Sequence, residues 1–265
     1  VVAGESVGTL FITGIVPGIL IGFGLMIVNF FISKKHGYKG AAKSERPSLW
    51  LTFKDSFLAL LTPIIILGGI YAGVFTPTES AVVAVFYSLF VGKFVYKELD
   101  LKTIFESLRS TAELNGSANL AVGLSMAFSA YLTMAQIPAM IGDFITSNIS
   151  NGTLIIIFML IILLIVGLFV DNISSCLVLT PIFLPIVTSI GYDPIHFGVI
   201  MTVALAIGFC TPPFGSNLFV ASTITGLRIE DICKRIVPFI LSMIVCLLLI
   251  TFIPAISMTL VHFMS

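Results

Sequence analysis

The chain has 265 residues, of which 58% are hydrophobic and only 10% are charged, and its mean hydropathy is +1.15. Soluble domains carry about 25% charged residues, so the composition excludes a soluble globular protein, and 23 phenylalanines exclude a disordered one. The 13 basic and 13 acidic residues balance, which leaves no net field that would attract nucleic acid.

Long stretches without ionisable side chains predict membrane-spanning helices. A spanning helix needs about 20 mainly apolar residues, and the stretches without Asp, Glu, Lys or Arg that are long enough include 114–142, 144–170, 172–192, 194–227 and 236–265. We therefore expect an all-α polytopic membrane protein that lies in a lipid bilayer. The candidate spans in chain order are 7–33, 56–75, 78–97, 115–134, 153–170, 172–190, 195–221 and 236–262.

The first span, 7–33, carries Gly14, Gly18 and Gly22 at four-residue spacing. This spacing predicts that another helix packs closely on that face. The segment that follows, 34–54, is strongly basic and contains a single acid, Glu45. The positive-inside rule therefore places it in the cytoplasm.

A helix-start signal separates the spans 56–75 and 78–97. Thr76 suits the N-cap, the proline after it suits the first helical position, and Glu79 suits the return bond of a capping box. Helix structure alone explains this pattern, so we assign it no chemistry. Further along the chain, residues 137–150 are apolar but short, which is typical of a segment at the membrane interface.

Charge placement predicts that residues 153–190 form a re-entrant helical hairpin with Asp171 at its tip. The turn 228–235 is basic and therefore cytoplasmic, like the segment 34–54. The number of spans between these two segments then requires both arms of the hairpin to open on the outer side of the membrane.

Asp171 is an acid between long uncharged stretches. A charge inside the membrane is a functional hypothesis by default, because its insertion costs about 2.5–3.5 kcal/mol. It also begins a polar run, residues 171–175, at the start of a helix whose positive dipole end attracts anions. The alternative is that Asp171 or Asn172 is an ordinary N-cap in a surface loop.

The span 195–221 contains a predicted break at Pro212 and Pro213. Neither proline has an N–H group, so the carbonyls of Gly208 and Phe209 lose their helical donors. Freed backbone groups at that depth are tolerated only where they face protein or a watery cavity. Together with the Thr211 hydroxyl they form a set of oxygen atoms suited to a hard monovalent cation. The alternative is a proline kink satisfied by a neighbouring helix.

No Lys or Arg occurs in residues 110–227. An anionic substrate would therefore be held in this half by helix N-termini, hydroxyl groups and bound cations, as in a cation-coupled importer. The chain contains no HExxH or GxxxxGK[ST] motif, and we expect that it is not an enzyme.

The chain contains three specific motifs: GGIYAGVFTPTE at 68–79, GYDPIHFG at 191–198 and TPPFGSNLF at 211–219. In this order they resemble the large membrane (M) subunit of tripartite ATP-independent periplasmic (TRAP) transporters. The resemblance implies an elevator-type secondary importer with two inverted repeats, each containing a re-entrant hairpin and a helix broken at Pro-Pro. The chain would hold the second repeat and the tail of the first, roughly the C-terminal three-fifths of the subunit.

The resemblance divides the chain into four segments. Residues 1–55 hold the first span, the basic loop and the connection from the first repeat, and residues 56–113 hold the helical pair with the GGIYAGVFTPTE motif. Residues 114–235 form the transport core with the hairpin and the broken helix, and residues 236–265 form the C-terminal span.

The resemblance also implies sodium as the coupling ion and names its ligands. The carbonyls of Gly208, Thr211 and Phe214 would bind sodium together with Gly167 of the hairpin, and Asp171 matches the hairpin acid of the family. The candidate substrate contacts, chosen by position alone, are Asn172, Ser174, Ser175, Ser216 and Asn217.

Partners and substrate follow from the same resemblance. We expect a small TRAP membrane subunit, a periplasmic substrate-binding protein and a location in the bacterial inner membrane. The substrate would be a small organic acid anion such as a C4-dicarboxylate or a sialic acid. As a whole, the sequence resembles the sialic-acid branch of the family more than the others, although no single residue carries this resemblance. Two alternatives remain: a proton-coupled transporter that uses Asp171 as the carrier, and a passive channel.

Overall fold

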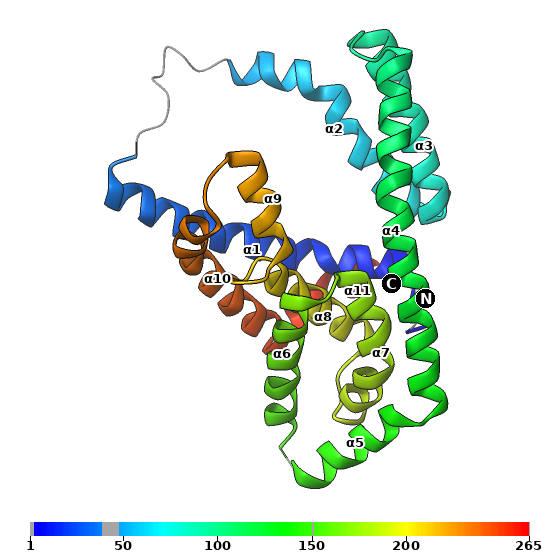
Figure 1. Cartoon of the computed structure of the whole chain (residues 1–265), viewed down its shortest axis with the longest axis vertical. Coiled ribbons are helices and arrows are strands. Elements are labelled where there is room, and N and C mark those ends of the chain that lie inside the picture. Colours follow the sequence, from blue (N-terminus) through cyan, green and yellow to red (C-terminus); the bar gives the residue numbers. More distant parts are fainter. Residues whose placement is uncertain (1–2, 39–47, 150, 265) are drawn as a thin grey trace. The chain divides into compact units, whose positions relative to one another are not determined.

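The computed structural model describes residues 3–149 and 151–264, except for 39–47. All regular secondary structure in these residues is helical, and no strand occurs among them (Figure 1). The chain falls into two compact units: a smaller unit, residues 38–118, and a larger unit that combines 1–37 with 119–265. The expected all-α fold is confirmed.

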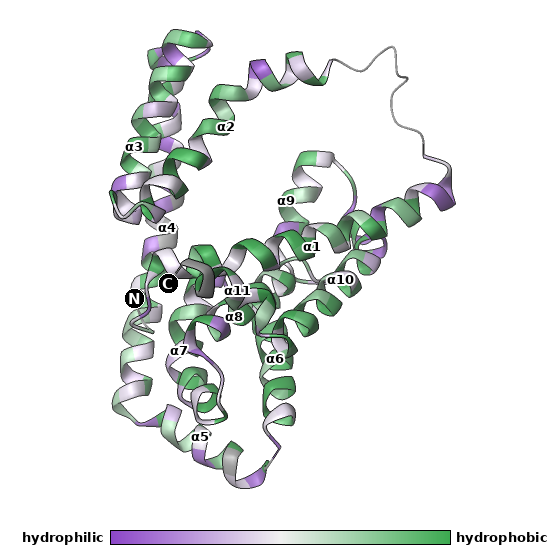
Figure 2. Cartoon of the chain, turned by 180° about the vertical axis from the view of Figure 1, so that it is seen from behind, coloured by the Kyte–Doolittle hydropathy of each residue, from purple (hydrophilic) through white to green (hydrophobic). Residues whose placement is uncertain are grey.

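Six helices in the described part of the chain are long and apolar enough to cross a membrane, which confirms a polytopic membrane protein. Figure 2 shows that α6 and α10 are hydrophobic along most of their length. The six are α1 (Val7–His36), α2 (Leu49–Tyr71), α3 (Pro77–Phe90) continued by the π-helical turn η1 (Val91–Val95), α6 (Gly152–Phe169), α7 (Asn172–Ser189) and α10 (Ile229–Phe252).

In the smaller unit, the predicted capping box begins α3. The Thr76 hydroxyl accepts a hydrogen bond from the Glu79 backbone N–H at 3.3 Å, and the Glu79 carboxylate accepts one from the Thr76 N–H at 2.8 Å. The Tyr87 phenol of α3 donates to the carbonyl of Leu58 at 2.8 Å and joins α3 to α2.

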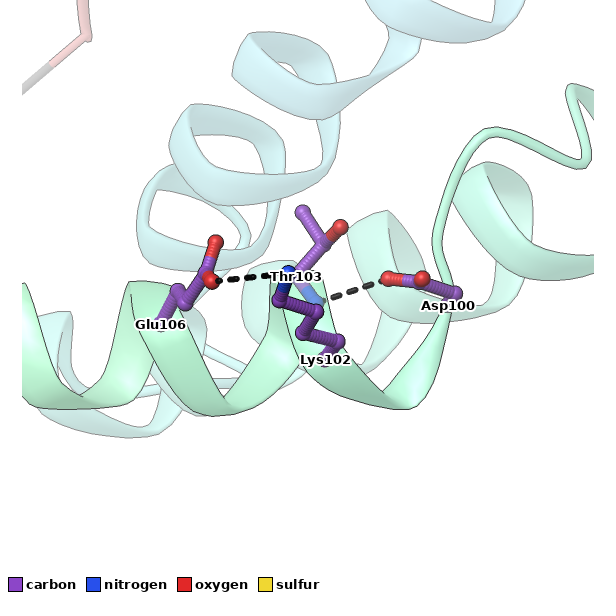
Figure 3. Close-up of polar contacts among 4 residues, drawn as sticks. All are labelled: Asp100, Lys102, Thr103 and Glu106. Atoms are coloured by element: carbon purple, nitrogen blue, oxygen red, sulfur yellow. Dashed lines mark hydrogen bonds and ion pairs between the residues drawn. The ribbon is translucent and has the colours of Figure 1, made fainter.

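An aspartate lies at the start of the helix α4 (Leu101–Met134) and accepts a hydrogen bond from its first turn. The Asp100 carboxylate accepts a hydrogen bond from the Thr103 backbone N–H at 2.7 Å (Figure 3). Hydrogen bonds from the side chain and backbone of Thr103 lower the pKa of Asp100 below its ordinary value. Lys102 and Glu106, one helical turn apart, form an exposed ion pair at 3.9 Å.

In the larger unit, the second half of α4 continues into α5 (Ile137–Asn148) through a bend of 64°. Gln136 at this bend has a positive φ of 56°, a left-handed conformation that few non-glycine residues adopt. The second half of α4, α5 and α6 run around α7 on three sides (Figure 1). In the short apolar segment predicted at 137–150, residues 137–148 are therefore a helix that packs on α7, and residue 150 lies outside the described residues.

Two helix breaks give the larger unit its distinctive features. The first separates α6 from α7 at Val170 and Asp171, as the hairpin prediction requires. The second separates α8 (Pro194–Phe209) from α9 (Ser216–Thr225). That the hairpin is re-entrant, and which side of the membrane it opens to, stays a prediction. The basic segment used to orient it, 34–54, lies partly outside the described residues.

The C-terminal span expected over about 236–262 is divided between two helices in the structure. The helix α10 begins earlier, at Ile229, and ends at Phe252, and α11 (Ala255–Met264) follows. Pro254 causes the break because a proline disfavours the helical conformation of the residue before it. Ile253 accordingly has φ −122° and ψ 82°, outside the helical region.

The predicted packing on Gly14, Gly18 and Gly22 is wrong for the described residues. A Cβ added at any of these three glycines would meet nothing within 4 Å. Close packing on α1 falls instead at Gly24, where a Cβ would lie 2.8 Å from Ser242 Oγ of α10. The face of α1 that is buried is thus set by the position of α10 and not by the glycine spacing.

Candidate functional site

The hairpin and the broken helix meet at two glycines. A Cβ added to Gly167 of α6 would lie 2.8 Å from the Leu205 carbonyl oxygen and 3.2 Å from the Cα of Gly208 in α8. Both glycines are buried, and no larger residue fits this backbone contact without a shift. The structure therefore brings together Gly167 and Gly208, two of the sodium ligands implied by the resemblance.

A second contact joins the tip of the hairpin to the loop between α8 and α9. The rings of Phe169 and Phe214 lie with their centroids 5.0 Å apart and their planes tilted by 36°. The Phe214 position, expected to contribute a carbonyl, is thus close to the hairpin. Phe169 is a contact that sequence reasoning missed, because a phenylalanine at the end of an apolar run carries no signal of its own.

Asp171 is the N-cap of α7. Its carboxylate accepts hydrogen bonds from the backbone N–H groups of Ile173 at 3.1 Å and Ser174 at 3.3 Å, while the side chain is exposed. The capping alternative stated for this acid is therefore present in the structure. Asp171 thus already occupies two of the N–H groups at the start of α7 that were expected to attract a substrate anion.

The loop that follows α8 replaces one of the two helical bonds removed by the prolines, the one to the Gly208 carbonyl. The Gly208 carbonyl accepts from the Thr211 N–H at 2.9 Å, and the Thr211 carbonyl accepts from the Gly215 N–H at 3.0 Å. The peptide bond between Pro212 and Pro213 is cis. A carbonyl oxygen has two lone pairs, so one helical-type bond leaves each of these oxygens able to bind a cation.

The Thr211 hydroxyl is oriented by its own hydrogen bond. It donates to the Ile207 carbonyl at 2.7 Å, which uses its only proton and leaves its lone pairs as acceptors. The described residues contain no group of three or more His, Cys, Asp or Glu side chains that could hold a metal. Carbonyl and hydroxyl oxygens suit hard ions, and Thr211 provides one of each.

The five candidate substrate contacts fall into two groups. Ser174 and Ser175 are buried in the first turn of α7, and the Ser175 hydroxyl donates to the Val170 carbonyl at 3.4 Å. Asn172 is half-buried beside them. Ser216 and Asn217 are exposed at the start of α9, and the Asn217 amide donates to the Cys210 sulfur at 3.4 Å. Only this second group presents its side chains at the surface.

The N-terminus of α9 differs from that of α7 in its cap. Its N-cap is Gly215, and no side chain accepts a hydrogen bond from its first turn. A Cβ at Gly215 would lie 2.5 Å from the Phe209 carbonyl oxygen, which explains why glycine occupies this tight position. The first N–H groups of α9 are consequently more open to an anion than those of α7.

Comparison with known proteins identifies one family along nearly the whole chain. Residues 1–256 match the family described as the DctM component of tripartite ATP-independent periplasmic transporters. The chain is 39% identical over 97% of its length to the isethionate TRAP transporter permease protein DctMQ of Oleidesulfovibrio alaskensis, covering 40% of that protein.

Two further relatives carry names for other substrates. The chain is 39% identical over 98% of its length to the C4-dicarboxylate TRAP transporter large permease protein DctM of Pseudomonas aeruginosa, covering 61% of it. It is 34% identical over 98% of its length to the sialic acid TRAP transporter large permease protein SiaM of Vibrio cholerae, again covering 61%. The chain thus spans between two-fifths and three-fifths of the length of these relatives.

Proposed function

Because the chain belongs to the DctM-component family of TRAP transporters, we propose that it forms part of a permease that imports a small organic anion. The family consists of transport permeases and not of enzymes. The six apolar helices found in the described residues make the chain a multi-pass protein of the bacterial inner membrane. The meeting of the hairpin and the broken helix at Gly167 and Gly208 is the observation that carries the proposal.

The proposed substrate is an anion with a carboxylate or a similar acidic group. Three of the relatives are named for isethionate, sialic acid and C4-dicarboxylates, all of which are small organic acids. The absence of Lys and Arg from residues 110–227 means that this half of a substrate site relies on backbone N–H groups, hydroxyls and bound cations. Among these acids, a C4-dicarboxylate or a sialic-acid-like sugar acid is the proposed class.

Sodium is the proposed coupling ion. The carbonyls of Gly208 and Thr211 and the Thr211 hydroxyl supply oxygens at the end of α8 and in the loop after it, and Gly167 is in contact with Gly208. In an elevator-type cycle, the hairpin and the broken helix would move together because this glycine contact joins their backbones. A small membrane subunit and a periplasmic substrate-binding protein are the proposed partners, on the basis of the family.

The bound cation would provide charge that the chain itself lacks. At an effective dielectric constant near 20, two unit charges about 4 Å apart attract each other by roughly 4 kcal/mol. The dipole of an open helix N-terminus adds about 0.3–1 kcal/mol. We assign this smaller contribution to α9 and not to α7, because Asp171 caps α7 with its own negative charge.

Anion binding to the purified full-length transporter, measured in sodium, potassium and choline, tests this proposal. We expect the affinity to be higher in sodium by tenfold or more, since 1.4 kcal/mol corresponds to a factor of ten. Equal affinity in the three salts would contradict sodium coupling.

Uptake into vesicles separates the two alternatives from the proposed function. Uphill accumulation driven by a sodium gradient excludes a passive channel. Accumulation driven by a proton gradient in the absence of sodium would instead support the proton-coupled alternative through Asp171.

A further inference from the structure

The helix α7 contains a proline that leaves a backbone carbonyl without its usual partner. In an α-helix, the carbonyl of residue i accepts from the N–H of residue i+4. The partner of Leu177 would be residue 181, which is a proline and has no N–H. In a membrane, where water does not replace the lost donor, such a carbonyl is costly to leave unsatisfied.

A side chain from α4 supplies the missing donor. The hydroxyl of Ser129 donates to the Leu177 carbonyl at 2.9 Å, across 48 positions of sequence. Ser129 is half-buried within the second half of α4, in the larger unit. The hydrogen bond between these two helices therefore occurs at the position where Pro181 weakens α7.

The two halves of α7 make different contacts. The half before Pro181 is bound to α4 through Ser129, and its Thr180 hydroxyl lies 3.5 Å from Met201 Sδ of α8. The half after it lies against α5, where a Cβ on Gly142 would be 3.5 Å from Ile186 Cγ1. The half before Pro181 is also the one that carries Asp171 and the buried serines of the hairpin tip.

We propose that Ser129 is a positioning residue for transport: its hydroxyl replaces the N–H that Pro181 lacks and thereby holds the first half of α7, with the hairpin tip, in place. This inference rests on the proposed transport function. Ser129 itself contacts neither sodium nor the anion in this proposal. It acts through the Leu177 carbonyl.

Hydrogen exchange of the full-length transporter tests the contact without relying on transport. We expect Ser129→Ala to speed amide exchange in residues 172–180 by about threefold and at most roughly eighteenfold, the fold-changes that correspond to the average and the largest measured strength of interhelical hydrogen bonds in a membrane protein. Exchange in residues 182–189 should change by less than this. Ser129→Thr retains a hydroxyl and should exchange like the unmodified protein.

The variant Pro181→Ala provides a matched control. It returns an N–H to position 181, so that Leu177 regains a donor within its own helix. In that background, Ser129→Ala should change exchange in residues 172–180 by less than twofold. Unchanged exchange in Ser129→Ala alone, or an equal effect in both backgrounds, would overturn the proposed contact.

Uptake kinetics test whether the contact positions the hairpin for transport. We expect Ser129→Ala to raise the KM for the anion more than it lowers the maximal rate, at unchanged protein abundance, and Ser129→Thr to restore the KM. Faster exchange with an unchanged KM would show a merely structural bond and overturn the positioning role. If the unmodified protein shows no sodium-dependent uptake, the proposed function is contradicted. The hydrogen-exchange result would still decide whether Ser129 bonds to Leu177.

Discussion

The backbones of Gly167 and Gly208 touch where α6 crosses α8, since a Cβ on Gly208 would lie 2.7 Å from the Cα of Gly167. Backbone atoms cannot move aside as the end of a flexible side chain can. The two helices therefore approach this closely only because both positions are glycine. This contact links the hairpin to the broken helix, and it is the basis of the first prediction.

Replacing either glycine with alanine should destabilise the larger unit. We expect Gly167→Ala and Gly208→Ala each to lower the free energy of unfolding by about 1–3 kcal/mol, the usual cost of overpacking a tight contact. Gly22→Ala in α1 is the control, because a Cβ there meets nothing within 4 Å. Unfolding of the purified transporter in denaturant measures the difference, and equal stability of all three variants would argue against a rigid α6–α8 contact.

Thr211→Ala should weaken the activation of uptake by sodium. The hydroxyl donates its proton to the Ile207 carbonyl and presents its lone pairs to the loop, so its removal deletes one oxygen ligand. We expect the sodium concentration for half-maximal uptake to rise about tenfold, equivalent to roughly 1.4 kcal/mol. Thr211→Ser retains the hydroxyl and serves as the control. A sodium dependence that is identical in the alanine and serine variants would remove Thr211 from the site.

Substitutions of Asp171 separate its capping role from proton transfer. Asparagine is also a good N-cap, whereas alanine costs about 0.5–2 kcal/mol of helix stability. Since Asp171 accepts from the N–H groups of Ile173 and Ser174, Asp171→Asn should retain sodium-driven uptake and Asp171→Ala should reduce it. If Asp171→Asn abolishes uptake although the protein inserts normally, Asp171 has a role that requires its ionisation.

Because both arms of the hairpin are expected to open on the outer side, its tip should lie within the membrane and be reached from that side. Asp171→Cys in a cysteine-free background should react with a membrane-impermeant thiol reagent added from outside. Labelling only from the cytoplasm would indicate that α6 and α7 each cross the bilayer completely, with a surface loop between them.

His196 should stabilise the junction between α8 and the break at Pro254. The imidazole is only 1% exposed, and its Nδ1 lies 2.5 Å from the Ser257 hydroxyl of α11. His196→Ala removes the ring from both the Ser257 hydroxyl and the Thr251 carbonyl, which lies 3.4 Å from Nε2, and we expect a loss of about 1–3 kcal/mol in the free energy of unfolding. Thr202→Ala on the same helix is the control, because Thr202 is exposed and bonds only to its own helix at Gly198. A loss of stability no greater than that of the control would contradict a stabilising contact between His196 and Ser257.

Features decided by neighbouring residues could be predicted from the sequence. The capping box at Thr76 and Glu79 depends on residues three positions apart, and it forms as expected. Apolar length likewise predicted the membrane helices, because the bilayer requires about 20 apolar residues wherever they pack. The break after α8 lies at the predicted prolines, since a missing N–H acts within one helical turn.

Features decided by contacts between distant segments required the tertiary structure. The glycine that packs closely in α1 is Gly24 and not Gly14, Gly18 or Gly22, because the position of α10 selects the face. Both interpretations of Asp171 were compatible with its sequence, and only the hydrogen bonds to α7 identify it as a cap. Ser129 carried no signal in the sequence, since the carbonyl it satisfies lies 48 residues away. A local pattern can show that a backbone group loses its partner, but only the packed helices determine which side chain replaces it.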